Sequence, residues 1–144
     1  MKKIIFAAGL TAVLLITSAC GDKAASDDGP ETVPVEWVNA HIQKDQGTMV
    51  ELLDKEQSAL DPEDEADNDL KVENYQLIEW KADNDRYFYE IKYEHPEENR
   101  IRTDRMEVVQ TNNGWKRAKY GDISDFDELV SSLEPKVLEE LHNQ

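Results

Sequence analysis

The pattern between residues 72 and 120 constrains the fold of this chain most, because apolar and polar side chains alternate there. The alternation is clearest in residues 86–93, where one set of alternate positions holds Tyr87, Tyr89, Ile91 and Tyr93. Successive side chains of a strand point to opposite faces of a sheet. The segment therefore predicts a strand with one apolar face.

Three neighbouring segments extend this strand into a predicted antiparallel meander. The four strand candidates are residues 72–81, 86–93, 101–110 and 115–120. Turn-forming residues separate them, and the strongest of these signals is Asn113-Gly114, which is typical of a tight hairpin. We therefore expect four strands joined in chain order.

Apolar residues at helical spacing precede this sheet. Val35, Val38 and Ile42 predict an amphipathic helix that begins near Thr32. A second short helix is expected over residues 49–53, with Thr48 as its N-cap.

Apolar residues at helical spacing also follow the sheet and predict a helical extension from about residue 122. They are Phe126, Leu129, Val130, Leu133, Val137, Leu138 and Leu141. The expected fold is thus α+β, with N-terminal helices packed on a curved four-stranded antiparallel sheet and a C-terminal helix.

The first nineteen residues have the pattern of a signal peptide. Lys2 and Lys3 precede an apolar run over residues 4–16, and small residues lead to the only cysteine, Cys20. The apolar run is too short to span a bilayer comfortably. We expect a signal peptide over residues 1–19, a flexible polar tether over 20–31 and one domain over 32–144.

The residues around Cys20 resemble the lipobox of bacterial lipoproteins, although Thr17 stands where that motif usually has leucine. The resemblance implies that the Cys20 thiol is lipidated and that the chain is cut just before it. The partner would then be the lipid bilayer, on the extracytoplasmic face of the cell membrane. Two acyl chains would hold the protein there stably.

The charge of the chain excludes one class of partner. It carries 32 acidic against 16 basic residues, for a net charge of −16. Such a surface repels nucleic acid and anionic headgroups, so we expect no nucleic-acid partner. With Cys20 lipidated no free thiol remains, and the sequence predicts no cofactor.

A resemblance to a known superfamily is carried by the residues PVEWVNAHIQKDQGTMVELLD, by the hairpin-linked strands and by NNGWKRAKYG. Over residues 32–120 the chain is similar to small exported lipoproteins of the nuclear-transport-factor-two-like superfamily, which has a cystatin-like fold. This resemblance implies a conical sheet wrapped around a helix, often with a pocket at its wide end. Members include isomerases, dehydratases and binding modules, so the fold does not fix the function.

Four aromatic residues are candidates for lining such a pocket: Trp80, Tyr87, Tyr89 and Tyr93. Tyrosines provide an apolar wall with hydroxyl groups that can bind a ligand. The alternative, which we favour, is that these side chains are cross-strand core and boundary residues.

The remaining chemistry-bearing residues predict no catalytic or metal site. In residues 61–72 the spacing of carboxylates resembles a calcium loop, but Ala66 and Val72 replace its required glycine and glutamate. We expect residues 54–69 to form a solvated, mobile loop. His41 and Asp45 lie four residues apart on the predicted helix, where they are expected to be a surface pair or a packed histidine.

Two functions from different classes fit these observations. The first is a non-catalytic binding or accessory module for a protein, peptide or small ligand. The alternative is a small lyase or isomerase of the ketosteroid isomerase-like type, which needs a desolvated acid or base in the pocket. Because the charged strand residues are expected on the face opposite the tyrosines, the sequence favours binding.

Overall fold

The computed structural model describes residues 29–142 and shows an α+β fold built on a five-stranded antiparallel sheet. The predicted signal peptide, Cys20 and residues 20–28 of the tether lie outside the described residues. In chain order the elements are α1 Thr32–Gln43, α2 Gln46–Leu52, β1 Tyr75–Lys81, β2 Arg86–Glu94, β3 Ile101–Thr111, β4 Gly114–Arg117, α3 Phe126–Val130 and β5 Pro135–Glu139. None of the helices in this part of the chain is long and apolar enough to cross a membrane.

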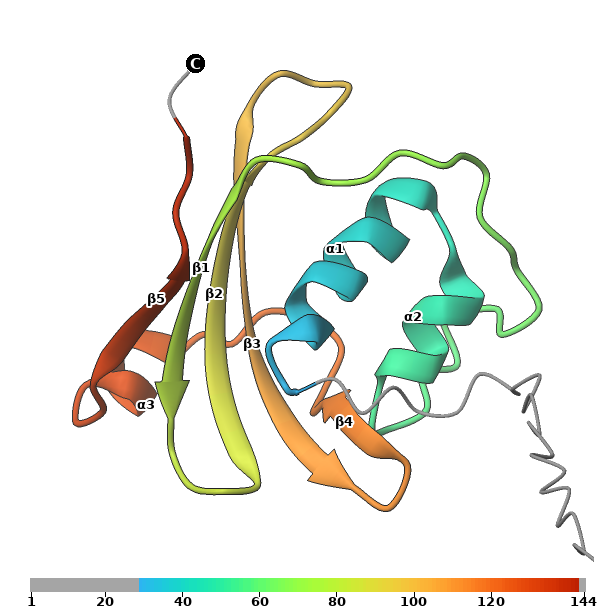
Figure 1. Ribbon diagram of the computed structural model, residues 1–144. Coiled ribbons are helices and arrows are strands. Elements are labelled where there is room, and N and C mark those ends of the chain that lie inside the picture. The colour runs from blue at the N-terminus through green and yellow to red at the C-terminus, as the bar shows by residue number, and fades with distance from the viewer. Residues whose placement is uncertain (1–28, 143–144) are drawn as a thin grey trace, which may run out of the picture.

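The predicted meander is confirmed as the strand order β4-β3-β2-β1, joined by hairpins (Figure 1). In the central pair, Tyr89 lies opposite Met106 and Tyr87 lies opposite Val108. The register therefore places the tyrosine row of β2 and the apolar residues of β3 on one face, as the period of two predicts. We call this the inner face, because α1 and α2 lie on it.

The expectation of four strands and a C-terminal helix is wrong in its details. Helix α3 spans only five residues, and the segment after it forms a fifth strand that pairs antiparallel with β1. Val137 lies opposite Ile78, and farther along Asn74 exchanges two 2.8 Å hydrogen bonds with the backbone of His142. Pairing satisfies the backbone groups that β1 would otherwise expose at its edge, and this outweighs the helical spacing of the apolar residues.

The main core lies between the inner face and the two N-terminal helices. It includes Trp37 and Val38 of α1, Met49 of α2, and Tyr89 and Ile91 of β2, all of which are buried. Trp115 of β4 is only half-buried and packs against the edge of this core.

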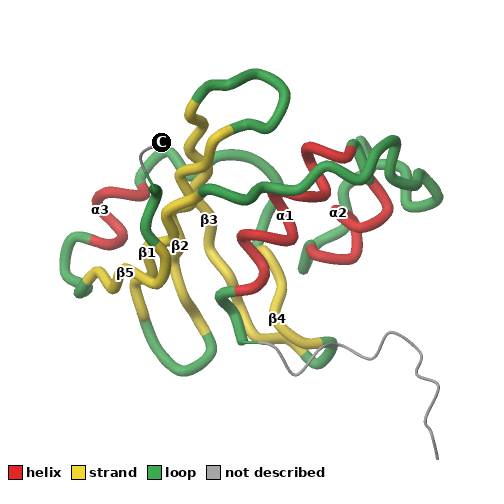
Figure 2. Tube along the Cα trace, turned by 45° about the horizontal axis from the view of Figure 1, so that its top comes forward, coloured by secondary structure: helices red, strands yellow, loops and turns green. Residues whose placement is uncertain are grey.

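A second, smaller core covers part of the opposite, outer face. Helix α3 lies on the side of the sheet away from α1 (Figure 2). It places Phe126 against Phe88 of β2 and Trp80 of β1, with ring centroids 6.0 and 5.4 Å apart. Arg105 of β3 lies over the Phe126 ring, with its guanidinium carbon 5.1 Å from the ring centroid. The outer face is therefore not simply a solvated surface.

The acidic segment 54–69 is largely exposed to solvent, as its composition predicts, but its backbone is anchored to the helices. Its backbone forms 2.9 Å hydrogen bonds from the Gly47 amide to the Asp64 carbonyl and from the Asp67 amide to the Gln43 carbonyl. The N-cap of α2 is Asp45, whose side chain accepts from the Thr48 amide at 2.9 Å, so the expected role of Thr48 as the cap is wrong.

Candidate ligand-binding cleft

A cleft of about 640 Å³ opens between α1 and the start of β3. Trp37 and His41 line it from α1, Tyr93 from β2, and residues 100–104 from the hairpin and β3. Arg117 and residues 120–122 close it from the end of β4. The curvature of the sheet brings these segments together at the end of α1 that faces the β2–β3 hairpin (Figure 1).

Arg117 forms the buried part of this cleft. It is 3% exposed and is the only charged side chain that is buried among residues 29–142. Its guanidinium carbon lies 4.3 Å from the centroid of the Trp37 ring, a cation–π arrangement. Arg117 occupies an inner-face position because it lies opposite Val108 in the sheet.

Each of the three nitrogens of the Arg117 guanidinium donates to an oxygen. Nη1 donates to the Asp104 carboxylate at 3.1 Å, Nε to the Lys119 carbonyl at 3.0 Å, and Nη2 to the Gly121 carbonyl at 3.0 Å. A buried charge is tolerated when it is paired and hydrogen-bonded in this way. The network fixes the segment after β4, which carries Tyr120, against the first half of β3.

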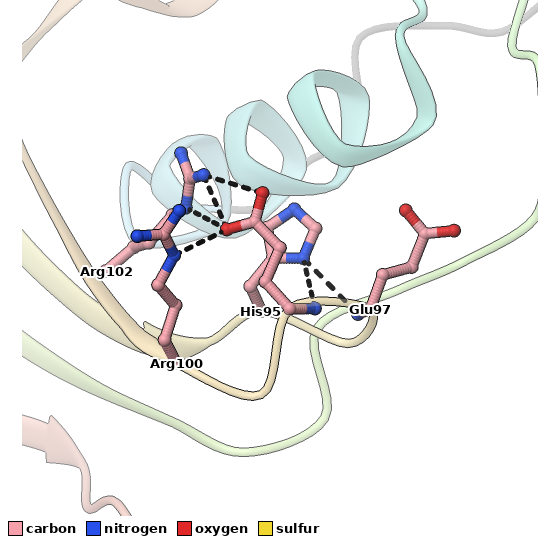
Figure 3. A network of polar contacts seen from close by, with 5 residues as sticks. His95, Glu97, Arg100 and Arg102 are labelled. Carbon is pink, nitrogen blue, oxygen red and sulfur yellow. Dashed lines mark hydrogen bonds and ion pairs between the residues drawn. The ribbon is translucent and has the colours of Figure 1, made fainter.

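The mouth of the cleft carries two further arginines, which share one carboxylate. Glu98 accepts from Arg102 Nε at 3.0 Å and from Arg102 Nη2 at 2.6 Å, and it accepts from Arg100 Nε at 2.9 Å (Figure 3). These charged hydrogen bonds lower the pKa of Glu98 to about 2. Glu98 is thereby an acceptor that holds both guanidinium groups in place.

The hairpin turn itself is organised around His95. Its Nδ1 atom accepts from the backbone amides of Glu97 and Glu98, at 3.3 and 3.4 Å (Figure 3). Asn99 follows with φ of 49°, a left-handed conformation that asparagine adopts more readily than most residues. The turn therefore positions Glu98 between the two arginines.

Exposed apolar side chains gather at the same cleft. Among residues 29–142 only three large hydrophobic residues are exposed: Ile101 at 46%, Tyr120 at 42% and Val137 at 48%. Ile101 and Tyr120 both line the cleft, and the Tyr120 ring packs edge-on against Trp37 with centroids 6.0 Å apart. Tryptophan, tyrosine and arginine are the residue types most enriched at binding hot spots.

The four aromatic pocket candidates do not come together. Tyr93 lines the cleft, and its pKa is raised by burial and by the nearby Asp104 carboxylate. Tyr89 is fully buried and donates from its hydroxyl to Glu79 at 2.6 Å, and burial together with this bond raises its pKa. Tyr87 is half-buried and lies between Tyr89 and Trp115.

Trp80 lies on the other side of the sheet from the three tyrosines. The register pairs Trp80 with Phe88, so both rings lie on the outer face against α3. Of the four candidates, only Tyr93 lines the cleft, and Tyr89 is part of the main core.

The expectation that charged strand residues avoid the inner face is also wrong. Arg102 lies opposite Tyr93 and Asp104 opposite Ile91, so both share the face of the tyrosine row. Arg117 joins them from β4 and was missed by sequence reasoning. The sequence did indicate its position, because Arg117 lies two residues after the partly buried Trp115 in the same strand. Residues two apart in a strand point to the same face of the sheet.

The carboxylates of Asp104 and Asp45, which could act as acids or bases, are already bound to other protein groups. Asp104 pairs with the buried Arg117. The Asp45 carboxylate accepts from the amide and the hydroxyl of Thr48, and within the described residues it forms no ion pair with His41, which was one of the two expected arrangements. His41 is exposed at the rim of the cleft. Within the described residues no group of three histidine, cysteine or carboxylate side chains is arranged to hold a metal ion.

The chemistry of the cleft is therefore that of a polar, aromatic-lined binding site with fixed hydrogen-bond donors. Comparisons of this chain with protein-family models, with curated proteins and with solved structures found no match.

Proposed function

We propose that this protein is a lipid-anchored, extracytoplasmic binding module, and that the cleft holds its ligand or the side chains of a peptide partner. One observation carries the proposal. Two of the three exposed large hydrophobic residues in the described part of the chain gather in a single cleft, beside Trp37 and three arginines. Scattered surface hydrophobics are ordinary, whereas a cluster rimmed by polar groups marks an interaction site.

The anchored location is supported by the sequence. The signal-peptide pattern of residues 1–19 is followed directly by Cys20, as a lipidation site requires, and α1 begins twelve residues farther on, at Thr32. A short polar tether would leave the cleft accessible from the medium.

A cystatin-like fold of the nuclear-transport-factor-two-like type is part of this proposal. It is supported by α1 lying across the inner face of an antiparallel meander, as in the expected cone. Strand β5 would then be an addition to the common fold, placed at the edge away from the cleft.

The alternative, a small lyase or isomerase, has less support from the cleft. Proton abstraction needs an acid or base that is desolvated and not already paired. Asp104 is bound to the Arg117 guanidinium, and His41 is exposed. The residues of the cleft are thus better suited to binding and orienting a ligand than to abstracting a proton from it.

A fragment screen by nuclear magnetic resonance tests the proposed site on the full chain in nonionic detergent. Three tryptophans give three indole N–H signals, of which Trp37 reports on the cleft and Trp80 on the outer face. We expect binding fragments to shift the Trp37 signal and to lose affinity in Tyr120→Ser. The matched control is Val137→Ser, which removes the exposed hydrophobic residue that lies outside the cleft. Fragments that shift only Trp80, or that bind Tyr120→Ser unchanged, would reject the cleft.

A further inference from the structure

The two arginines at the mouth of the cleft retain hydrogen-bond donors that Glu98 does not use. A guanidinium has five N–H groups. Arg102 gives its Nε and Nη2 atoms to Glu98, and Arg100 gives only Nε. Within residues 29–142, Arg102 Nη1 and both terminal nitrogens of Arg100 have no protein acceptor.

These donors belong to side chains that line the cleft. Arg100 and Arg102 line the cleft, whereas Glu98 does not. Glu98 therefore holds the two guanidinium groups without itself lining the cleft. Because it fixes two long side chains in advance, less conformational entropy is lost when a ligand binds to them.

The charge around the cleft contrasts with that of the molecule. The chain as a whole carries −16, yet three arginines among the lining residues face only two carboxylates, Asp104 and Asp122. Adding Glu98 makes this region neutral and not negative. An anion that approaches the cleft therefore finds unused N–H donors of Arg100 and Arg102, and it is repelled less there than by the rest of this acidic surface.

We infer that the ligand of the cleft carries an oxyanion group, a carboxylate or a phosphate, which binds to Arg100 and Arg102. An apolar part of the same ligand lies on Ile101 and Tyr120, beside the edge of Trp37. Arginine is suited to this role because its planar fork binds two oxygens at once. The inference deepens the proposed function and rests on it.

The test titrates the full chain, in nonionic detergent, with benzoate and with benzyl alcohol, which has the ring but no charge. The Trp37 indole N–H reports binding, and the Trp80 signal checks that each variant is folded. We expect benzoate to bind at least about tenfold more tightly than benzyl alcohol, since hydrogen bonds to charged groups are worth more than neutral ones. Arg102→Gln and Arg100→Gln should each weaken benzoate binding several-fold.

The matched control is Arg105→Gln, on the same strand β3. It removes the same charge, but Arg105 pairs with Glu90 and Asp127 on the outer face, outside the cleft. Benzoate affinity should be unchanged in this variant. Inorganic phosphate distinguishes the two oxyanions, because competition with benzoate would include phosphate in the ligand class, and a lack of competition would restrict it to carboxylates.

Two results would overturn the inference in distinguishable ways. Equal affinity for benzoate and benzyl alcohol, or equal weakening by Arg102→Gln and Arg105→Gln, would reject the oxyanion and leave the cleft as a binding site. Benzoate shifts confined to Trp80 would reject the site itself, and with it the proposed function.

Discussion

At the scale of single residues, Arg117 joins the stability of the fold to the shape of the cleft. It pairs with Asp104 of β3, stacks on Trp37 of α1 and donates to two carbonyls of the segment after β4. Each of these groups belongs to a different wall of the cleft. A change at this one side chain therefore acts on the domain and on the candidate site together.

Arg117→Ala should destabilise the domain by about 3–5 kcal/mol, because removing one partner of a buried pair leaves the other charge and two carbonyls without their donors. Urea denaturation at pH 7 measures the free energy of unfolding. Lys119→Ala is the control, since Lys119 is exposed two residues away and its side chain should contribute less than about 0.5 kcal/mol. A loss below about 1 kcal/mol in Arg117→Ala would contradict the role assigned to this network.

Glu98 gives a pH dependence with a defined sign. Its pKa is lowered from 4.5 to about 2 by hydrogen bonds from Arg102 and Arg100. A depressed pKa contributes stability that is present above 4.5 and is lost as the pH falls toward 2. The carboxyl ¹³C signal of Glu98 should titrate near pH 2, and a midpoint near 4.5 would show that the ion pairs do not form in solution.

Thermal denaturation of a variant tests the same pKa shift independently. Glu98→Gln should melt below the unmodified chain at pH 7, and the difference should close as the pH is lowered toward 2. Glu97→Gln, at the next position of the turn, serves as control because its side chain does not contact the two arginines in the described structure. A difference that stays constant with pH would assign the effect of Glu98 to something other than its charge.

At the scale of elements, the sequence predicts the meander well because local signals suffice for it. Alternation sets the faces, and turn residues such as Asn113-Gly114 fix where one strand ends and the next begins. Helix α1 was predicted for the same reason, since its apolar stripe is a local pattern.

Features that depend on pairing between strands could not be predicted from local sequence patterns. Val137 and Leu138 have helical spacing with Leu141, but the open edge of β1 takes residues 135–139 as a strand. Trp80 was grouped with the tyrosines of β2, and only the register with Phe88 shows that it faces the other way. The periodicity within one strand does not reveal how that strand is aligned with its neighbour.

Gly47 provides a prediction at the element scale. It lies in the first turn of α2, where alanine is normally the better helix former by about 1 kcal/mol. A Cβ atom here, however, would lie 2.7 Å from the Asp64 carbonyl oxygen and 3.0 Å from that of Pro62. Gly47→Ala should therefore destabilise the domain, by about 1–2 kcal/mol in urea denaturation, in spite of its helix propensity.

Hydrogen exchange locates the effect of this substitution. The Asp67 amide, which donates to the Gln43 carbonyl, should exchange faster in Gly47→Ala, because the acidic segment can no longer lie close to α2. Amides of β2 that pair with β3 are the internal reference. A variant as stable as the unmodified chain would mean that the segment is not held against the helices.

At the scale of the whole molecule, the arrangement is a negatively charged domain with one neutral, aromatic-lined cleft. The net charge of the full chain is −16, and a charge of this sign and size favours solubility and repels anionic surfaces. On the proposal that the protein is lipid-anchored, its attachment would therefore come from acyl chains and not from electrostatic attraction.

Cys20→Ser tests that attachment. Without the thiol the chain cannot be acylated, so in membrane fractionation it should move from the pellet to the soluble fraction or accumulate as uncut precursor. Ser18→Ala, a neighbouring change that keeps the cysteine, should remain in the membrane fraction. Unchanged fractionation and processing of Cys20→Ser would reject the lipid anchor.

The position of β5 also determines the order in which the fold can be completed. Hairpins join β1 to β4 through short turns, whereas pairing Val137 with Ile78 closes a loop of about 60 residues and is intrinsically slower. A chain that lacks its last ten residues would leave β1 as an open edge, ready to pair with another copy. We therefore expect the chain to be most prone to aggregation while it folds, in the interval before β5 pairs with β1.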